Sequence, residues 1–146
     1  MNPETVFQIA SKVAVIGWLI LIIAPNWKYT KNITTILIST LAFGGLYAFF
    51  IGTSFGEAEG GFSSLTDVRK LFMNDRALLA GWIHYLSFDL FIGTWEIENA
   101  KSLGVSRWFV LPCQILTFLF GPIGLLLYFL IRLAVTKNIK QGNTFA

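Results

Sequence analysis

Long apolar runs separated by short polar connections dominate the chain. Four runs are long enough to cross a bilayer as helices, at about 20 residues for each crossing. They cover residues 6–24, 33–51, 77–97 and 108–132. Because backbone groups in hydrocarbon must hydrogen-bond within their own segment, these runs are predicted to be helices rather than strands. The pattern therefore predicts an all-α membrane protein, a four-transmembrane-helix bundle that forms a single domain over residues 1–146.

The longest connection, between the second and third runs, predicts a further short helix over residues 63–73. Its apolar residues fall on one side and its charged residues on the other, with Ser64 placed three before Asp67 as in a capping box. We expect this amphipathic interfacial helix to lie along the membrane surface or to cover one mouth of the bundle.

Composition agrees with a membrane location. Apolar residues make up 55% of the chain and charged residues 13%, against roughly 25% charged in soluble domains. The net charge of +3 is spread over loops and the C-terminal end, which suits lipid headgroups and gives no basic stripe for nucleic acid. The single cysteine, Cys113, excludes an intrachain disulfide. Membrane lipids are thus the expected partners.

Basic residues predict an orientation. Four crossings would place both termini on one side, together with the connection over residues 52–75. That side would carry Arg69, Lys70, Arg76, Lys137 and Lys140, and the other side would carry Lys28, Lys31, Lys101 and Arg107. Since cytoplasmic loops carry the excess of Lys and Arg, both termini are predicted to be cytoplasmic. Glu4 stands where a signal peptide would be basic, so the first run is expected to be retained.

The third run carries three ionisable side chains into the bilayer, where each is a candidate functional residue because of its cost. Asp89 and Glu96 are seven residues apart and lie nearly on one line of an ideal helix, flanked by Trp82 and Tyr85. His84 lies roughly 120–140° away. We therefore expect His84 and Asp89 to meet groups of other helices rather than each other.

The fourth run supplies possible partners for these groups. One side of it carries polar and small residues: Gln114, Thr117, Gly121, Tyr128 and Arg132. Pro112 and Pro122 are expected to bend the helix and to free the backbone carbonyls of Trp108 and Phe118. The third and fourth runs are thus predicted to form two walls of a lipophilic cavity.

Each candidate also has a structural interpretation. His84 would serve as a hydrogen-bonding link between helices, Glu96 would snorkel to water from the helix end, and Cys113 would be a small apolar filler. Asp89 has no such simple alternative, because a carboxyl among apolar neighbours must be protonated, paired or wetted. One histidine and no cysteine cluster predict neither a metal site nor a cofactor. Acid–base chemistry on a lipophilic molecule is the reaction class that remains.

Two stretches resemble the ABA-deficient-4-like membrane family. They are Gly-Trp-Ile-His-Tyr-Leu-Ser-Phe-Asp-Leu-Phe-Ile-Gly-Thr-Trp-Glu over residues 81–96, and Leu-Pro-Cys-Gln followed by Leu-Thr-Phe-Leu-Phe-Gly-Pro-Ile-Gly-Leu over residues 111–125. The resemblance covers about residues 5–135. The family comprises plant plastid proteins required to form neoxanthin from violaxanthin, and bacterial relatives. Without a plastid transit peptide, this chain resembles the bacterial branch, which implies a bacterial inner membrane.

The resemblance implies binding or rearrangement of a carotenoid or another isoprenoid lipid, as by an intramolecular isomerase. Neoxanthin formation opens an epoxide and removes a carbon-bound proton, so it needs an acid and a base. His84 and Asp89 match the plant pattern and are the implied catalytic pair, whereas Glu96 stands in a stretch that departs from that pattern. The expected substrate-binding residues are Trp82, Tyr85, Glu96, Gln114, Thr117, Tyr128 and Arg132.

Two other functions remain open. A non-catalytic lipid- or pigment-binding protein, or an assembly factor with a membrane-enzyme or homo-oligomeric partner, would use His84 and Asp89 to hold helices together. Proton or ion passage would need a continuous polar path. The polar side of the fourth run suggests one, but Phe and Leu dominate elsewhere, so this function ranks last.

Overall fold

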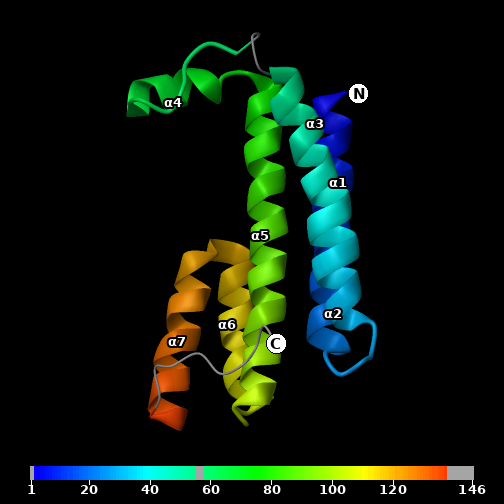
Figure 1. The fold of residues 1–146 in the computed structure, drawn as a ribbon, viewed down its shortest axis with the longest axis vertical. Coiled ribbons are helices and arrows are strands. Elements are labelled where there is room, and N and C mark those ends of the chain that lie inside the picture. Colours follow the sequence, from blue (N-terminus) through cyan, green and yellow to red (C-terminus); the bar gives the residue numbers. More distant parts are fainter. Residues whose placement is uncertain (1, 55–57, 138–146) are drawn as a thin grey trace.

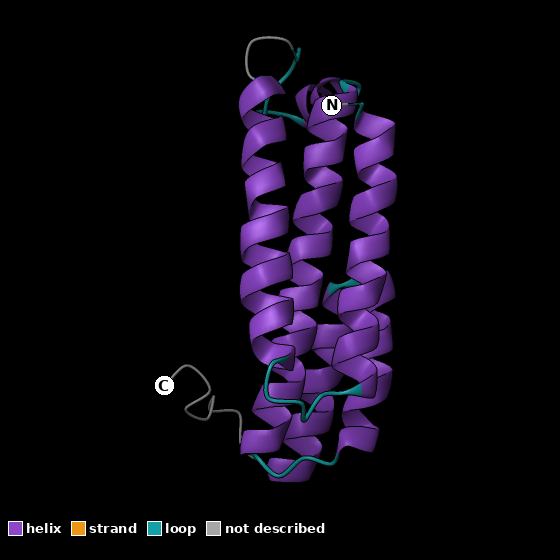
Figure 2. Ribbon diagram, turned by 90° about the vertical axis from the view of Figure 1, so that its right-hand side faces the viewer, coloured by secondary structure: helices purple, strands orange, loops and turns teal. Residues whose placement is uncertain are grey.

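Three long helical rods form the frame of the protein. The computed structural model describes residues 2–54 and 58–137. The rods are α1 (Pro3–Ile23), α5 (Asp75–Ser102), and a composite of α2 (Thr30–Asn32), η1 (Ile33–Phe43) and α3 (Gly44–Ser54). All three are long and apolar enough to cross a membrane. They lie side by side along the long axis of the molecule (Figures 1 and 2). The described residues contain no strand, so the all-α prediction is confirmed.

Local capping explains where two of the rods begin. The Asn2 side chain accepts a hydrogen bond from the backbone N–H of Glu4, and Pro3 occupies the first turn of α1, where its missing N–H costs nothing. Asn74 does the same for α5, because its side chain accepts from the backbone N–H groups of Arg76 and Ala77. Both starts lie at the same end of the molecule (Figure 1).

The composite rod contains an unusual π-helical segment, η1, which is joined to α5 by hydroxyl groups. The Ser39 hydroxyl donates to the carbonyl of Thr34, five residues earlier, at 2.7 Å. In α5, the Ser87 hydroxyl donates to the Ser39 carbonyl at 2.8 Å, and the Thr94 hydroxyl donates to the Thr34 hydroxyl at 2.8 Å. These contacts fix the register between the second rod and α5.

Glycines allow α1 to approach α5 closely. A Cβ atom at Gly93 would lie 2.3 Å from the Trp18 ring, and one at Gly17 would lie 2.7 Å from the Leu90 side chain. Trp18 and Leu90 are both buried, at 3% and 0% exposure. A small residue at such a position lets the side chain of one helix lie directly against the backbone of the next, as is common between membrane helices.

The fourth apolar run does not form one helix. It forms α6 (Arg107–Phe120) and α7 (Pro122–Thr136), which fold back on each other as a hairpin beside one half of α5 (Figure 1). Gly121 makes the turn with φ of 48°, a conformation that favours glycine, and Pro122 supplies no N–H to continue α6. At about 21 Å and 23 Å, both helices are shorter than the roughly 30 Å hydrocarbon core. The prediction of one continuous helix over residues 108–132 is therefore wrong.

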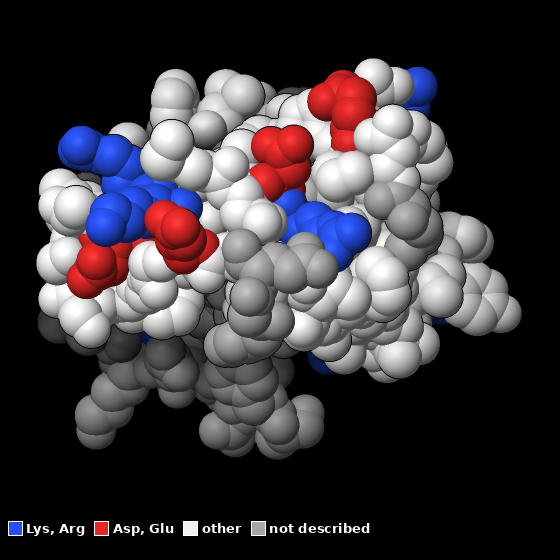
Figure 3. All heavy atoms as spheres, turned by 90° about the horizontal axis from the view of Figure 1, so that it is seen from above, with Lys and Arg blue, Asp and Glu red and all other residues white. Residues whose placement is uncertain are grey.

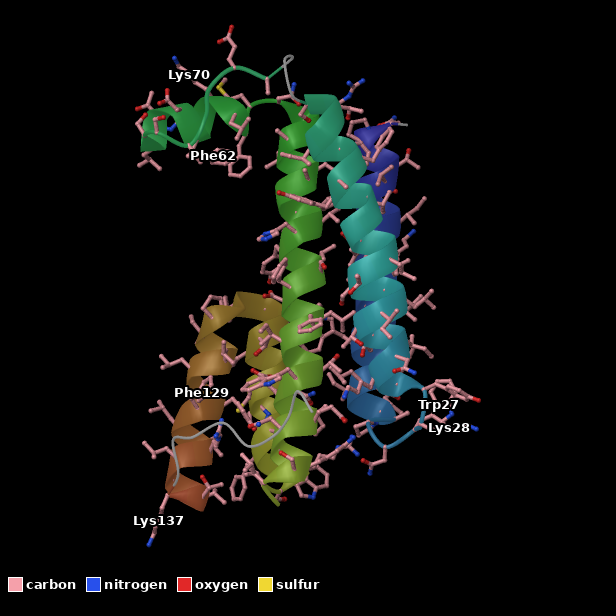
Figure 4. All side chains as sticks on the ribbon, in the orientation of Figure 1. Trp27, Lys28, Phe62, Lys70, Phe129 and Lys137 are labelled. Atoms are coloured by element: carbon pink, nitrogen blue, oxygen red, sulfur yellow. The ribbon has the colours of Figure 1, made fainter. Side chains whose placement is uncertain are left out.

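The hairpin changes where the described ends of the chain lie. The start of α1 and Lys70 are at one end of the molecule, whereas Lys137 is at the other end with Trp27 and Lys28 (Figures 1 and 4). The described ends of the chain thus lie at opposite ends of the molecule, because the C-terminal segment turns back at Gly121, and the prediction that both termini share one side of a membrane stays a prediction.

The predicted amphipathic segment contains a helix, α4 (Leu65–Leu71), which is shorter than the expected range of 63–73. The Ser64 side chain accepts from the backbone N–H of Asp67 at 3.1 Å, so the predicted cap is confirmed. The helix extends away from the end of α5 (Figure 1), and Figure 3 shows basic and acidic side chains interspersed across this end. Phe72, just beyond α4, lies against Gly81, whose Cβ would be 3.1 Å from that ring.

Candidate functional site

The centre of the candidate site is Asp89, at the midpoint of α5. Its carboxyl group lies against Gly121 at the tip of the hairpin, since a Cβ atom at residue 121 would be 2.9 Å from Asp89 Oδ1. The side chain is half-buried, and among the described residues Oδ2 is buried without a hydrogen-bond partner. A carboxyl group is thus held at mid-length of a helix that is long and apolar enough to cross a membrane, with an atom available for a further partner.

Tyr85 lies one turn before Asp89 and connects α5 to the same tip. Its hydroxyl donates to the Phe118 carbonyl at 2.9 Å. In a continuous α-helix the Phe118 carbonyl would accept a hydrogen bond from the backbone N–H of residue 122. Residue 122 is a proline and has no N–H, so this bond is missing. The predicted freeing of the Phe118 carbonyl is therefore confirmed, and the phenol of α5 takes the place of the missing donor. The phenol also lies close enough to the Asp89 carboxyl to interact with it.

His84 lies on a different side of α5. Its side chain is exposed, and its ring contacts are with Phe88 at 4.6 Å and with Tyr47 of α3 at 5.7 Å between centroids. Five residues of helix separate it from Asp89 by about 140° of rotation and about 7.5 Å of rise. The described contacts do not bring His84 and Asp89 together, as expected from their spacing.

Trp82 faces α1. Its indole N–H donates to the Ser11 hydroxyl at 3.1 Å, and its ring lies 5.4 Å from Phe7 and 5.4 Å from Tyr85. Together with the starts of α1 and α5 it lines a cleft of about 390 Å³ that also includes Asp75. Trp82 therefore borders both this cleft and the Tyr85 side of the candidate site.

Beyond the tip, the hairpin and α5 enclose a group of polar side chains that we call the polar cluster. Each member is no more than 2% exposed: Glu96, Asn99, Gln114, Thr117, Tyr128 and Arg132, with Tyr128 packed against Trp95. All of the predicted fourth-run binding residues lie in this cluster rather than beside Asp89. The hairpin folds them inward against the second half of α5.

Hydrogen bonds link the cluster across the three helices. The Thr117 hydroxyl donates to Glu96 Oε1 at 2.8 Å, and the Gln114 amide donates to the Gly93 carbonyl at 3.2 Å. The Tyr128 hydroxyl donates to Asn99 Oδ1 at 2.6 Å. Glu96 is fully buried, so the interpretation that it snorkels to water is wrong. Its burial depends on the hairpin, which covers the helix end where snorkelling was expected.

Two members of this region were missed from the sequence. Asn99 lay beyond the predicted end of the third run at residue 97, but α5 continues to Ser102, and Asn99 stands three residues after Glu96 on the same side. Gly124 allows α6 and α7 to touch, since a Cβ there would lie 2.2 Å from the Thr117 hydroxyl oxygen. The three-residue spacing between Glu96 and Asn99 could have indicated the role of Asn99. The Gly-Pro pair at 121–122 could have indicated the turn that brings Gly124 against α6.

Cys113 packs beside the cluster as a buried side chain whose thiol donates to the Phe109 carbonyl at 3.3 Å. This placement agrees with its interpretation as a small filler. Within residues 2–54 and 58–137, no three His, Cys, Asp or Glu side chains gather as a metal site would require.

A family model described as ABA DEFICIENT 4-like matches residues 5–128. The chain belongs to the ABA DEFICIENT 4-like family. The match runs from α1 into α7, so Asp89, the hairpin tip and most of the polar cluster lie within the ABA DEFICIENT 4-like region. Among curated proteins no match is found. The solved structures likewise contain no match.

The family assignment confirms the resemblance that residues 81–96 and 111–125 indicated in the sequence. One of them, residues 81–96, supplies the central part of α5, and the other, residues 111–125, supplies the inner part of the hairpin. The two stretches meet in space where Asp89 contacts Gly121. Membership of the bacterial branch stays a prediction.

Proposed function

We propose that this protein binds a carotenoid or another long isoprenoid lipid along α5, and isomerises it with Asp89 as the acid–base group. The single observation that carries this proposal is the Asp89 carboxyl group. It lies midway along a membrane helix, against a glycine at a helix turn, with one oxygen that has no partner among the described residues. An ionisable group at such depth is costly and by default functional.

The surface available to a lipophilic ligand is the part of α5 between α4 and the hairpin tip, which we call the open face: Tyr85, Phe88 and Asp89, with His84 at its edge toward α3. Phe88 is 58% exposed and His84 is also exposed, so hydrocarbon reaches this face. The hairpin bounds it on one side and α4 on the other, with Phe62 beside α4 (Figures 1 and 4). A polyene chain would pack on these rings and end at Asp89.

One carboxyl group suffices for the acid and base steps of an epoxide-to-allene isomerisation. Asp89 in its acid form gives its proton to the epoxide oxygen as the carbon–oxygen bond breaks. The resulting carboxylate removes the carbon-bound proton, which restores the acid, so no proton is gained or lost. Tyr85, fixed by the Phe118 carbonyl, orients the oxygen. His84 contacts the chain of the ligand, because a base 140° around the helix does not reach the same carbon.

The membrane arrangement proposed with this function has three crossings, by α1, the composite rod and α5, and a re-entrant hairpin. The helix α4 lies at the membrane surface, where Phe62 and Leu65, at 78% and 77% exposure, enter the headgroup boundary. We place the protein in a bacterial inner membrane, as the resemblance to the bacterial branch implies.

Pigment analysis tests the proposal. The chain is expressed in bacteria that make epoxide-bearing carotenoids, and pigments are separated by chromatography. Conversion is expected with the wild-type chain and with Glu98→Gln, a matched control on α5 whose carboxylate pairs with Lys101 at 2.7 Å. Asp89→Asn should abolish conversion, Tyr85→Phe should slow it, and His84→Ala should weaken binding. Unchanged pigments with every epoxide supplied would contradict the isomerase proposal.

A second candidate function is binding without turnover, which the apolar open face favours because Phe88 and His84 form a surface that a pigment can cover. Native mass spectrometry of the purified protein distinguishes the two. A retained, chemically unchanged carotenoid that Phe88→Ala removes and Asp89→Asn does not would assign the protein to pigment binding.

A further inference from the structure

The cleft between the first turns of α1 and α5 takes no part in the proposed chemistry. Its volume is about 390 Å³, within the range of roughly 300–1,000 Å³ that is typical of small-molecule sites. The two helices line it with two carboxylates, one amide and apolar side chains: Asn2, Pro3, Glu4, Phe7, Asp75, Leu78, Leu79 and Trp82. The cleft is therefore acidic where the helices begin and apolar further along them.

The charge of this cleft selects a cationic group. Among the described residues that line it, Glu4 and Asp75 are the charged ones, and both are exposed. The Gln8 amide holds the Glu4 carboxylate in place by donating to Oε1 at 3.0 Å. An anion is disfavoured, because the side chains of Asn2 and Asn74 already accept from N–H groups in the first turns of the two helices.

The cleft lies at the headgroup level of a bilayer that α5 crosses. The 28 residues of α5 extend about 42 Å, close to the roughly 40–45 Å of a bilayer with its headgroups. Asp75, the first residue of α5, would then lie at the outer edge of the headgroup layer. Trp82 is seven residues later, about 10 Å deeper and on nearly the same side of the helix. Since a headgroup layer is about 5–8 Å thick, Trp82 would lie where the hydrocarbon begins.

The apolar walls of the cleft are open to lipid. Phe7 and Trp82 are each 38% exposed, and Leu78 is 53% exposed. The Phe7 and Trp82 rings lie 5.4 Å apart, and the Trp82 indole donates to the Ser11 hydroxyl, which fixes its orientation. Aromatic faces also attract an ammonium group. A ligand with a cationic end and an apolar chain would therefore match both parts of the cleft.

We propose that this cleft binds an aminophospholipid, with the primary ammonium group between Glu4 and Asp75 and an acyl chain along Phe7 and Trp82. A primary ammonium group has three N–H donors for the carboxylates, whereas a trimethylammonium group has none. The cleft should therefore prefer ethanolamine headgroups to choline headgroups. A soluble amine would satisfy the carboxylates but would leave the apolar walls uncovered. The inference depends neither on Asp89 nor on pigment conversion.

Native mass spectrometry of the detergent-purified protein tests this preference. Phospholipids with identical chains and either ethanolamine or choline headgroups are added at equal concentration. The wild-type protein should bind the ethanolamine lipid at least about tenfold more tightly, because charge-assisted hydrogen bonds are the strong ones. Combining Glu4→Gln with Asp75→Asn should bring the ratio of the two affinities close to one. Glu59→Gln, which removes an exposed carboxylate outside the cleft, is the matched control and should keep the wild-type ratio.

Asp75→Asn alone should lower the preference part of the way, and it carries the test if the double variant does not fold. Trp82→Leu should weaken the binding of both lipids, since the apolar walls do not distinguish their headgroups. Equal binding of the two lipids to the wild-type protein, or a wild-type ratio in the carboxylate variants, would overturn the proposal. Displacement of the lipid by an equal concentration of phosphoethanolamine would also overturn it, because the cleft would then be a site for a soluble amine.

Discussion

Asp89 and Gly121 meet at the tip of the C-terminal hairpin, where a Cβ atom at residue 121 would lie 2.9 Å from Asp89 Oδ1. Gly121 also has a φ of 48°. The same glycine therefore turns the chain and makes room for the carboxyl group. This double requirement explains why the hairpin ends level with Asp89.

The first prediction concerns this glycine. Gly121→Ala should lower the free energy of unfolding by at least about 1–2 kcal/mol, because an L side chain is strained at this φ and would meet the carboxyl group. Thermal unfolding in detergent measures the effect. Gly45→Ala, in α3 with nothing within 4 Å of its Cβ, is the matched control and should be neutral or slightly stabilising. Equal unfolding temperatures for the two variants would contradict the description of the turn.

A second prediction addresses the contact between α1 and α5. Gly93→Ala would place a methyl group 2.3 Å from the Trp18 ring and should destabilise the protein by about 1–3 kcal/mol. Trp18→Leu in the same chain should recover part of the loss, because the smaller side chain makes room. Gly52→Ala, in open space, serves as the control. Additive effects of the Gly93 and Trp18 substitutions would show that the two residues do not touch.

Tyr128→Phe is the third prediction. It removes the 2.6 Å hydrogen bond to Asn99 inside the polar cluster and should cost about 1–2 kcal/mol of unfolding free energy. Tyr29→Phe, at a residue that is 48% exposed, should change little. If both substitutions were equally mild, the buried bond would not contribute to stability.

The fourth prediction is topological. Lys137 should face the opposite side of the membrane from Ser63, because the hairpin turns back. Regrouping the described loop residues puts Lys28, Lys31, Lys101, Arg107 and Lys137 on one side, against Arg69, Lys70 and Arg76 on the other. The positive-inside rule then predicts a cytoplasmic Lys137 and an external Ser63, whereas four crossings predicted both residues to be cytoplasmic.

Labelling with a membrane-impermeant maleimide checks this arrangement. In a Cys113→Ala background, Ser63→Cys should react on intact cells with the outer barrier permeabilised, and Lys137→Cys should react only after lysis. Equal behaviour of the two residues, whether both react on intact cells or both react only after lysis, would place them on one side of the membrane, as four crossings require.

The sequence was sufficient for features that depend on nearby residues. The cap at Ser64 needs only the residue three places later, and the free carbonyl of Phe118 follows from Pro122 alone. The rods of α1, of Thr30–Ser54 and of α5 follow from apolar length. The rotation between His84 and Asp89 follows from helix geometry, so their separation was also predictable.

Features that depend on tertiary packing were not predictable in the same way. Residues 108–132 are apolar enough to span, and hydropathy does not distinguish a continuous helix from two halves that turn at Gly121. The depth of Glu96 follows from that turn, because the hairpin encloses the end of α5. The pattern of apolar residues likewise did not predict the π-helical geometry of η1. This segment is hydrogen-bonded to α5 through hydroxyl groups, and those contacts depend on tertiary packing.

The re-entrant hairpin also has a consequence for biosynthesis. Both ends of the hairpin, the start of α6 and the end of α7, lie toward the end of the molecule where α5 finishes (Figure 1). In the three-crossing arrangement that we propose, α5 would be the last crossing within the described residues. The hairpin would then dock on α5 from the side where both of its ends lie. A reporter domain inserted after Lys137 would stay on the side of the membrane that holds the end of α5.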